Sequence, residues 1–420
     1  MSCSLRPLGA VFLFLALLRP AWSQPLTLPE AQRLATSRSQ QLVASEASTA
    51  ATRELAVAAG QLPDPVLTLG LENIPLSGPA RLSLTRDFMT AQRIGLMQEL
   101  PRAEKRALRV ERVQRDADRI RAERELALIE IQRETALAWI ERAYSLAMLE
   151  LLTAQLAETR LQVQGAEVAF RGGRGSQADI FGARTAVASL QDRVRDIERQ
   201  ARGATLALAR WVGPEAATRP LGGAADWRAS RVGEALTTDR LRLHPRLAVL
   251  DAQVQAAETE LRLAQANTRA DWTVEAAYSR RGPAYADMVS ISVSVPLQLD
   301  RRNRQDREVA ARLAALNEVR AQQEEALRVE EAAVRVLIND WATGKVRLAE
   351  LAGELLPASQ NRTEAALAAY RAGRADLTSA LAARRDEIDA RVQLLSLELE
   401  LARSWARLNY LFADPSVAPH

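Results

Sequence analysis

The chain is poor in the side chains that most often bind metals or form covalent bonds. Its 420 residues contain one cysteine (Cys3), two histidines (His244 and His420) and five scattered methionines. Cys3 lies in the N-terminal leader described below, so the remaining chain can form no disulfide, no thiolate metal site and no lipid-bearing cysteine. His244 precedes Pro245 at the start of a predicted helix and is expected to be a capping or loop residue. The sequence therefore predicts neither a metal site nor a cofactor.

Long hydrophobic runs and an excess of charge of one sign are also missing. Residues 1–23 combine Arg6, an apolar run and small residues before Gln24, which is the pattern of a secretory signal peptide. Beyond Gln24 no run approaches the roughly 18 apolar residues that indicate a transmembrane helix. Arg6 and Arg19 are two of the 56 basic residues, which leaves 54 against 52 acidic ones. A nearly neutral chain gives no reason to expect nucleic acid as a partner.

Catalytic patterns are absent as well. We find no nucleophile paired with a base, no phosphate-binding loop and no metal-ligand spacing. The carboxylates lie in charge runs typical of helix surfaces, where they pair with neighbouring arginines. We therefore predict that the chain is not an enzyme.

What the chain does have is an internal duplication. The segment 170–174, Phe-Arg-Gly-Gly-Arg, returns 200 positions later at 370–374 as Tyr-Arg-Ala-Gly-Arg. Each copy lies between long stretches rich in Ala, Leu, Glu and Arg, and two short alternating segments precede each copy. Such a repeat decides how the rest of the chain is interpreted. The sequence predicts two helix–hairpin–helix repeats at 24–212 and 241–412, a connector at 213–240 and a tail at 413–420.

Proline and glycine divide each repeat into predicted elements. The predicted fold class is mainly α with a small β part. In the first repeat we expect a helix over 29–61 with no break before Gly60, strands at 66–72 and 94–100, a helix over 102–171 with a coiled-coil seam, and a helix ending near Trp211. In the second we expect a helix over 245–266, strands at 272–279 and 288–295, a helix over 303–370 with candidate interruptions near Gly344 and Pro357, and a helix ending near Leu411.

The predicted strands alternate between apolar and polar side chains, which places the two kinds on opposite faces. No charged side chain falls on the apolar face. Such strands fit a transmembrane barrel, whose wall has lipid on one side and water on the other. They also fit two amphipathic hairpins packed on a soluble core, and the alternation leaves that alternative open. The residues predicted to face lipid are Leu67, Leu69, Ile94, Leu96, Val274, Tyr278, Ile291 and Val293.

Four strands are too few to close a barrel. An open edge in hydrocarbon leaves backbone N–H and C=O groups unpaired, and each unpaired group is costly. Several copies of the chain would therefore have to pool their strands. Three copies would supply twelve strands, whereas about eight strands give an interior filled by side chains. Dimers and tetramers remain open.

Several short patterns, taken in order, resemble the TolC-type outer-membrane factors of tripartite efflux pumps and type I secretion systems. The resemblance covers essentially all of the chain after the leader. It includes Gln98-Glu99-Leu100-Pro101 and the two Phe/Tyr-Arg-x-Gly-Arg turns. The segments 62–65 (Leu-Pro-Asp-Pro) and 296–304 (Pro-Leu-x-x-Asp-Arg-Arg-Asn-Arg) are most similar to the outer-membrane members of heavy-metal resistance pumps.

The resemblance implies a homotrimer with a 12-stranded transmembrane β-barrel in the outer membrane, continued by an α-helical tunnel through the periplasm. The implied partners are outer-membrane lipid, a periplasmic adaptor protein and an inner-membrane efflux pump of the RND type. The implied function is a passive exit duct for heavy-metal cations. The alternatives are drug efflux, type I secretion and, from another class, a periplasmic coiled-coil scaffold.

In that arrangement the two glycine-containing turns would lie at the periplasmic tip of the tunnel. Glycine permits the positive φ that reverses two long helices. The neighbouring charges would then serve adaptor docking or gating, whereas the simpler interpretation is that these segments are only turns. The predicted tip residues are Gly173, Arg174, Asp179, Gly373, Arg374 and Asp376.

Overall fold

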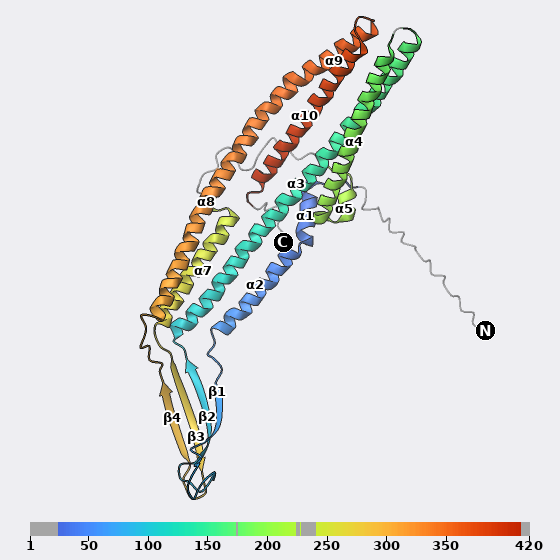
Figure 1. Cartoon of the computed structure of the whole chain (residues 1–420). Coiled ribbons are helices and arrows are strands. Elements are labelled where there is room, and N and C mark those ends of the chain that lie inside the picture. Colours follow the sequence, from blue (N-terminus) through green and yellow to red (C-terminus); the bar gives the residue numbers. More distant parts are fainter. Residues whose placement is uncertain (1–23, 174, 224–226, 228–240, 413–420) are drawn as a thin grey trace, which may run out of the picture.

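Two helical hairpins and one four-stranded sheet form an elongated molecule in the computed structural model (Figure 1). The structure describes residues 24–173, 175–223, 227 and 241–412. The predicted signal peptide at 1–23, Arg174, most of the connector and the tail at 413–420 lie outside the described residues. The sheet occupies one end of the molecule, and the turns of both helical hairpins lie at the other.

The first repeat follows the predicted order. Helices α1 (Leu28–Arg38) and α2 (Gln40–Ala59) lead to strand β1 (Val66–Glu72). The hairpin returns through β2 (Ala91–Leu100) into the long helix α3. Helix α3 (Ala103–Arg171) then reverses into α4 (Gln177–Val212), which packs along it.

The prediction of one unbroken helix before Gly60 is wrong, because Ser39 interrupts it. The backbone of Ser39 is extended, and its hydroxyl accepts a hydrogen bond from the backbone N–H of Leu42 at 3.4 Å. Serine side chains compete for backbone hydrogen bonds and favour the first position of a helix. Ser39 therefore ends α1 and caps α2.

The second repeat has the same order of elements. After the short helix α5 (Pro214–Thr218), the described chain resumes and contains α7 (Pro245–Asn267), β3 (Trp272–Arg281), β4 (Met288–Ser294), α8 (Gln305–Glu350), the π-helical turn η2 (Leu351–Leu355), α9 (Leu356–Arg371) and α10 (Leu377–Asn409).

Of the two interruptions predicted between residues 303 and 370, only the one near Pro357 is present. Proline removes a backbone donor and clashes with the preceding turn, and the wider turn η2 lies directly before it. Helix α8 continues through Gly344. A Cβ atom at Gly344 would lie 2.5 Å from Cδ2 of Leu401, so this glycine permits close packing between α8 and α10.

The sheet has the order β1-β2-β3-β4, and all neighbours are antiparallel. The pair β2–β3 joins the two repeats, while β1 and β4 form the edges. Among the described helices, none combines the length and the apolar character needed to cross a membrane.

The largest buried cluster joins both repeats where extended segments cross the helices. The indole N–H of Trp139 donates to the carbonyl of Leu26 at 3.0 Å, and that of Trp341 donates to the carbonyl of Trp227 at 3.1 Å. Leu26 also pairs with Leu221 in an isolated parallel bridge. Each repeat therefore has a tryptophan on its long helix, α3 or α8, whose indole binds a backbone carbonyl outside the helices.

Candidate functional site

The register of the sheet places the eight predicted lipid-facing residues on one face. Val274, for example, is the Cα partner of Val293. A shift of one residue in any strand would turn its apolar side chains to the other face, so the register matters. Two complete rows cross the sheet, Leu67–Leu96–Ala276–Ile291 and Leu69–Ile94–Tyr278–Val289.

No described helix covers this apolar face. The sheet extends beyond the ends of α2, α3, α7 and α8 (Figure 1). Seven of the eight residues are 43–74% exposed, and Val274 is half-buried. The alternative in which the hairpins pack on a helical core is therefore wrong for the described chain. A contiguous exposed apolar face of this kind indicates contact with lipid or with another protein.

The opposite face carries a cluster of charges that the sequence did not single out. Arg93 contacts two carboxylates, because its Nη1 lies 2.8 Å from Oε1 of Glu72 and its Nη2 lies 2.8 Å from Oε1 of Glu275. Gly95 leaves room for this contact, since a Cβ atom there would lie 2.9 Å from Oε1 of Glu275. The alternation of the strands places each of the three charges on the polar face, but only the register between strands brings them together.

Both helical turns have the backbone geometry expected of them. Gly173 has φ of 69° and Gly373 has φ of 68°, a region that residues with a Cβ atom rarely adopt. Gly173 N–H donates to the carbonyl of Phe170 at 3.0 Å, and Gly373 N–H donates to that of Tyr370 at 2.9 Å. The predicted positive φ of both glycines is confirmed.

The two aspartates predicted as docking charges cap the returning helices. Asp179 forms a capping box with Ser176, in which Asp179 N–H donates to Ser176 Oγ at 3.1 Å and Ser176 N–H donates to Asp179 Oδ2 at 2.8 Å. Asp376 accepts hydrogen bonds from the hydroxyl and the backbone N–H of Ser379. These two bonds lower the pKa of Asp376. The spacing Ser-x-x-Asp at 176–179 was the signal for a capping box.

Arg374 differs from the two aspartates. Its backbone N–H donates to the carbonyl of Ala369 at 2.9 Å, and its side chain is exposed. Within the described part of the tip, the guanidinium of Arg374 has no ion pair. Arg174 of the other turn lies outside the described residues.

Behind the turns, a groove of about 700 Å³ lies between α4 and α10. Asp179 lines one wall, and Arg193 of α4 and Asp389 of α10 are joined by an ion pair of 2.7 Å. Residues near the capped start of α4 and residues of α10 line the same groove. The two helical hairpins therefore form one continuous surface near the tip.

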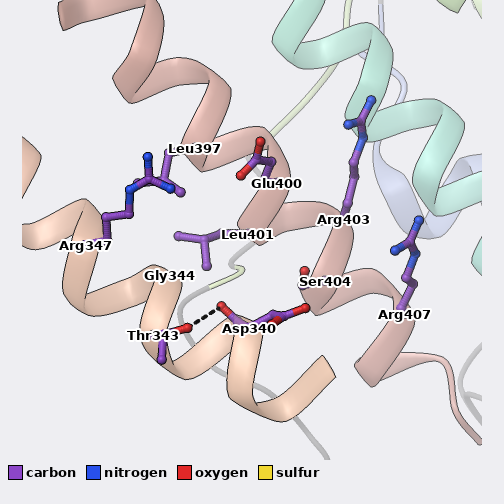
Figure 2. Close-up of a pocket in the computed structure, with 10 residues that line it drawn as sticks. All are labelled: Asp340, Thr343, Gly344, Arg347, Leu397, Glu400, Leu401, Arg403, Ser404 and Arg407. Atoms are coloured by element: carbon purple, nitrogen blue, oxygen red, sulfur yellow. Dashed lines mark hydrogen bonds between the residues drawn. The ribbon is translucent and has the colours of Figure 1, made fainter. Parts of the chain in front are cut away.

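A smaller pocket of about 430 Å³ lies between α8 and α10 (Figure 2). Its lining includes Arg347, Arg403 and Arg407, and Arg403 also pairs with Glu141 of α3. In Figure 2, Leu401 projects between the arginine of α8 and those of α10. None of the predicted site residues lines this pocket.

His244 caps α7, as its position before Pro245 predicted. Its Nδ1 accepts a hydrogen bond from the backbone N–H of Arg246 at 3.3 Å. Burial lowers the pKa of His244, which favours the neutral imidazole. No group of three or more potential metal-binding side chains occurs among the residues that the structure describes.

No protein-family model matches the sequence, and no curated protein matches it. Solved structures do match. The outer-membrane channel OprN matches with a TM-score of 0.77 and 17% identity, over 91% of this chain and 89% of its own. The chain has the fold of the TolC-type outer-membrane channels.

Two further solved structures match the chain over nearly its whole length. The outer-membrane protein VceC of Vibrio cholerae has a TM-score of 0.75 and 18% identity, over 91% of this chain and 95% of its own. CusC, which forms a transmembrane channel, has a TM-score of 0.77 and 13% identity, over 94% of each chain. At these identities the likeness establishes the fold alone.

We expect Asp376→Ala to lower the midpoint of thermal unfolding, because it removes the acceptor that caps α10, whereas Asp376→Asn keeps an acceptor oxygen. The folded pKa lies below the unfolded value of about 3.9, so the carboxylate contributes fully above that pH and loses its contribution as pH falls further. Melting curves recorded by circular dichroism between about pH 7 and pH 3 test both expectations.

The matched variant at the other turn is Ser176→Ala, for which a lost cap costs about 0.5–2 kcal/mol. If Asp376→Ala melts like the parent at every pH, the capping role is wrong.

Proposed function

We propose that the chain is the outer-membrane channel of a tripartite efflux system, a passive exit duct that performs no chemistry. The sheet carries this proposal, because one of its faces is exposed and mostly apolar, while the other is polar and charged. The expectation that no charge falls on the apolar face fails at one place, because β3 extends far enough to put Arg280, near its end, on that face. A tilted strand of roughly 9–11 residues spans the hydrocarbon of a bilayer. Strands β2 and β3 have 10 residues each. The helices would then extend from the outer membrane into the periplasm.

Three copies of the chain complete the channel in this proposal. Strands β1 and β4 are sheet edges, and unpaired edges are excluded from hydrocarbon. The contact β2–β3 already joins the two repeats within one chain, so the duplication supports an equivalent contact between β4 of one copy and β1 of the next. The edge helices support the same assembly, because α2 exposes Val57 and α8 exposes Val329. A homotrimer gives twelve strands.

The deciding experiment compares two adjacent residues of β4. Ile291→Arg places a charge on the face proposed to contact lipid, which costs about 2–4 kcal/mol near the bilayer midplane. It should abolish heat-modifiable trimers in the outer-membrane fraction. Ser290→Arg lies on the opposite face and should leave the trimers intact while it changes the conductance in planar bilayers.

Equal assembly of these two variants would contradict a membrane-spanning strand. Release of the parent protein by salt, without detergent, would favour the alternative of a periplasmic coiled-coil scaffold.

We propose that the turns at the other end contact a periplasmic adaptor, which connects the duct to an inner-membrane pump of the RND type. The side chain of Arg374 supports this docking role, because it is exposed and has no ion pair with any residue that the structure describes. The caps at Asp179 and Asp376 support it indirectly. Each cap stabilises the first residues of the helix that follows a turn, and so fixes the position of that turn. The groove between α4 and α10 offers further surface beside the turns.

We expect Arg374→Glu to reduce cross-linking between the adaptor and a cysteine introduced at Ala375, without loss of the trimer. Arg335→Glu, at an exposed arginine of α8, is the matched control and should cross-link like the parent. If both variants cross-link equally well, these segments are only turns.

Heavy-metal cations are the proposed cargo. The segments 62–65 and 296–304 support this choice, since they resemble the channels of metal-resistance pumps. Deletion of the chain should reduce the tolerance of the host cell to copper, silver or zinc more than its tolerance to dyes and detergents, as measured by growth at graded concentrations. A larger loss of tolerance to dyes and detergents than to metals would indicate drug efflux instead.

A further inference from the structure

The charged cluster on the polar face of the sheet has an arrangement suited to controlling which ions enter the barrel. We propose that Glu72, Arg93 and Glu275 give the barrel wall a preference for cations over anions. This inference rests on the proposed channel function and names residues that would determine its selectivity.

Glu275 lies at the centre of the cluster and has partners on the three other strands. Its carboxylate accepts a hydrogen bond from Nη2 of Arg93 on β2 at 2.8 Å. Longer contacts of 3.5 Å join it to the hydroxyls of Thr68 on β1 and Ser292 on β4. The carboxylate is therefore held against the wall of the sheet, with its position fixed by the register of all four strands.

The cluster remains in contact with water, although its groups are paired. The side chains of Glu275 and Arg93 are 23% and 27% exposed, and that of Glu72 is 40% exposed. Gly95 makes this arrangement possible, because a Cβ atom there would lie 2.5 Å from Oγ1 of Thr68 and 2.9 Å from Oε1 of Glu275. The charges thus lie at the polar surface, where their field reaches the lumen.

The cluster has an uneven balance of charge. Two carboxylates share one guanidinium, which leaves one net negative charge in each chain. The other charged residues on this face of the strands, Glu99 and Arg281, have opposite signs and lie at opposite ends of the sheet, with Arg281 in the row of Glu72. In a trimer the cluster recurs in every copy at one level of the barrel, so a ring of net negative charge surrounds the lumen.

Salt limits how far this ring can act. The screening length is about 30 Å at 0.01 M salt, about 10 Å at 0.1 M and about 3 Å at 1 M. The preference for cations should therefore be strongest in dilute salt and largely absent at 1 M. A preference that persists unchanged at high salt would have another cause.

The test measures the ratio of potassium to chloride permeability of trimers in planar bilayers, from the reversal potential in a gradient of dilute potassium chloride. Glu275→Gln neutralises the net charge of the cluster and should move the ratio toward one. Arg93→Gln leaves both carboxylates uncompensated and should raise the ratio above that of the parent. Glu275→Asp and Arg93→Lys preserve the charges and should preserve the parent ratio.

Opposite shifts from the two glutamine variants support the proposal. Unchanged ratios, or shifts in the same direction, overturn it. If Glu275→Gln fails to form heat-stable trimers, Glu72→Gln removes the same charge at a more exposed position and gives the same test. A parent protein that forms no conducting pores contradicts the channel function itself, whereas a conducting parent that is indifferent to these substitutions contradicts only the selectivity.

Discussion

The pairing of backbone groups at the edges of the sheet is the constraint on which the proposed assembly depends. Within one chain, β1 and β4 each have a neighbour on one side only. In water such an edge could bond to solvent, but a lipid environment offers no substitute donor or acceptor. The apolar face of the sheet requires lipid or protein, and the edges require strands. A closed ring of copies meets both requirements at once.

The duplication explains how one sequence can satisfy this constraint with few elements. The contact between β2 and β3 already joins two repeats inside the chain. A contact of the same kind between chains would need no new type of interface. The long helices are arranged in a similar way. Within the chain α3 packs between α2 and α7, whereas one side of α2 and one side of α8 remain exposed and could contact another copy. The chain thus contains its own pattern for contact with a second copy.

Much of this fold could be predicted because its signals are periodic and local. Alternation over a few residues located all four strands, and proline and glycine located most helix ends. Ser39 was missed because one serine in an otherwise helical stretch gives no stronger signal than its neighbours. Near Pro357 the sequence predicted an interruption, but it did not predict the form, a π-helical turn over Leu351–Leu355.

The candidate sites also divide into those that local sequence predicts and those that depend on contacts between distant segments. Positive φ at Gly173 and Gly373 could be predicted from the sequence, because a tight turn between two helices requires it. The cluster around Arg93 was not predictable, because Glu72 and Glu275 meet it only through the register of separate hairpins. At the tip, the charge of Asp376 suggested docking, while its local hydrogen bond to Ser379 gives it a structural role that is independent of any partner.

The placement of Leu26 has a consequence for the order in which the protein acquires its structure. The indole that binds its carbonyl belongs to a residue 113 positions later, and Leu221, its bridge partner, comes later still. The N-terminal segment can complete these contacts only after the whole first repeat and the start of the connector have been synthesised. Contacts so distant in sequence carry a large entropy of loop closure and form slowly. A chain truncated before residue 221 would leave Leu26 without its bridge partner, and such incomplete packing exposes apolar surface to chaperones and proteases.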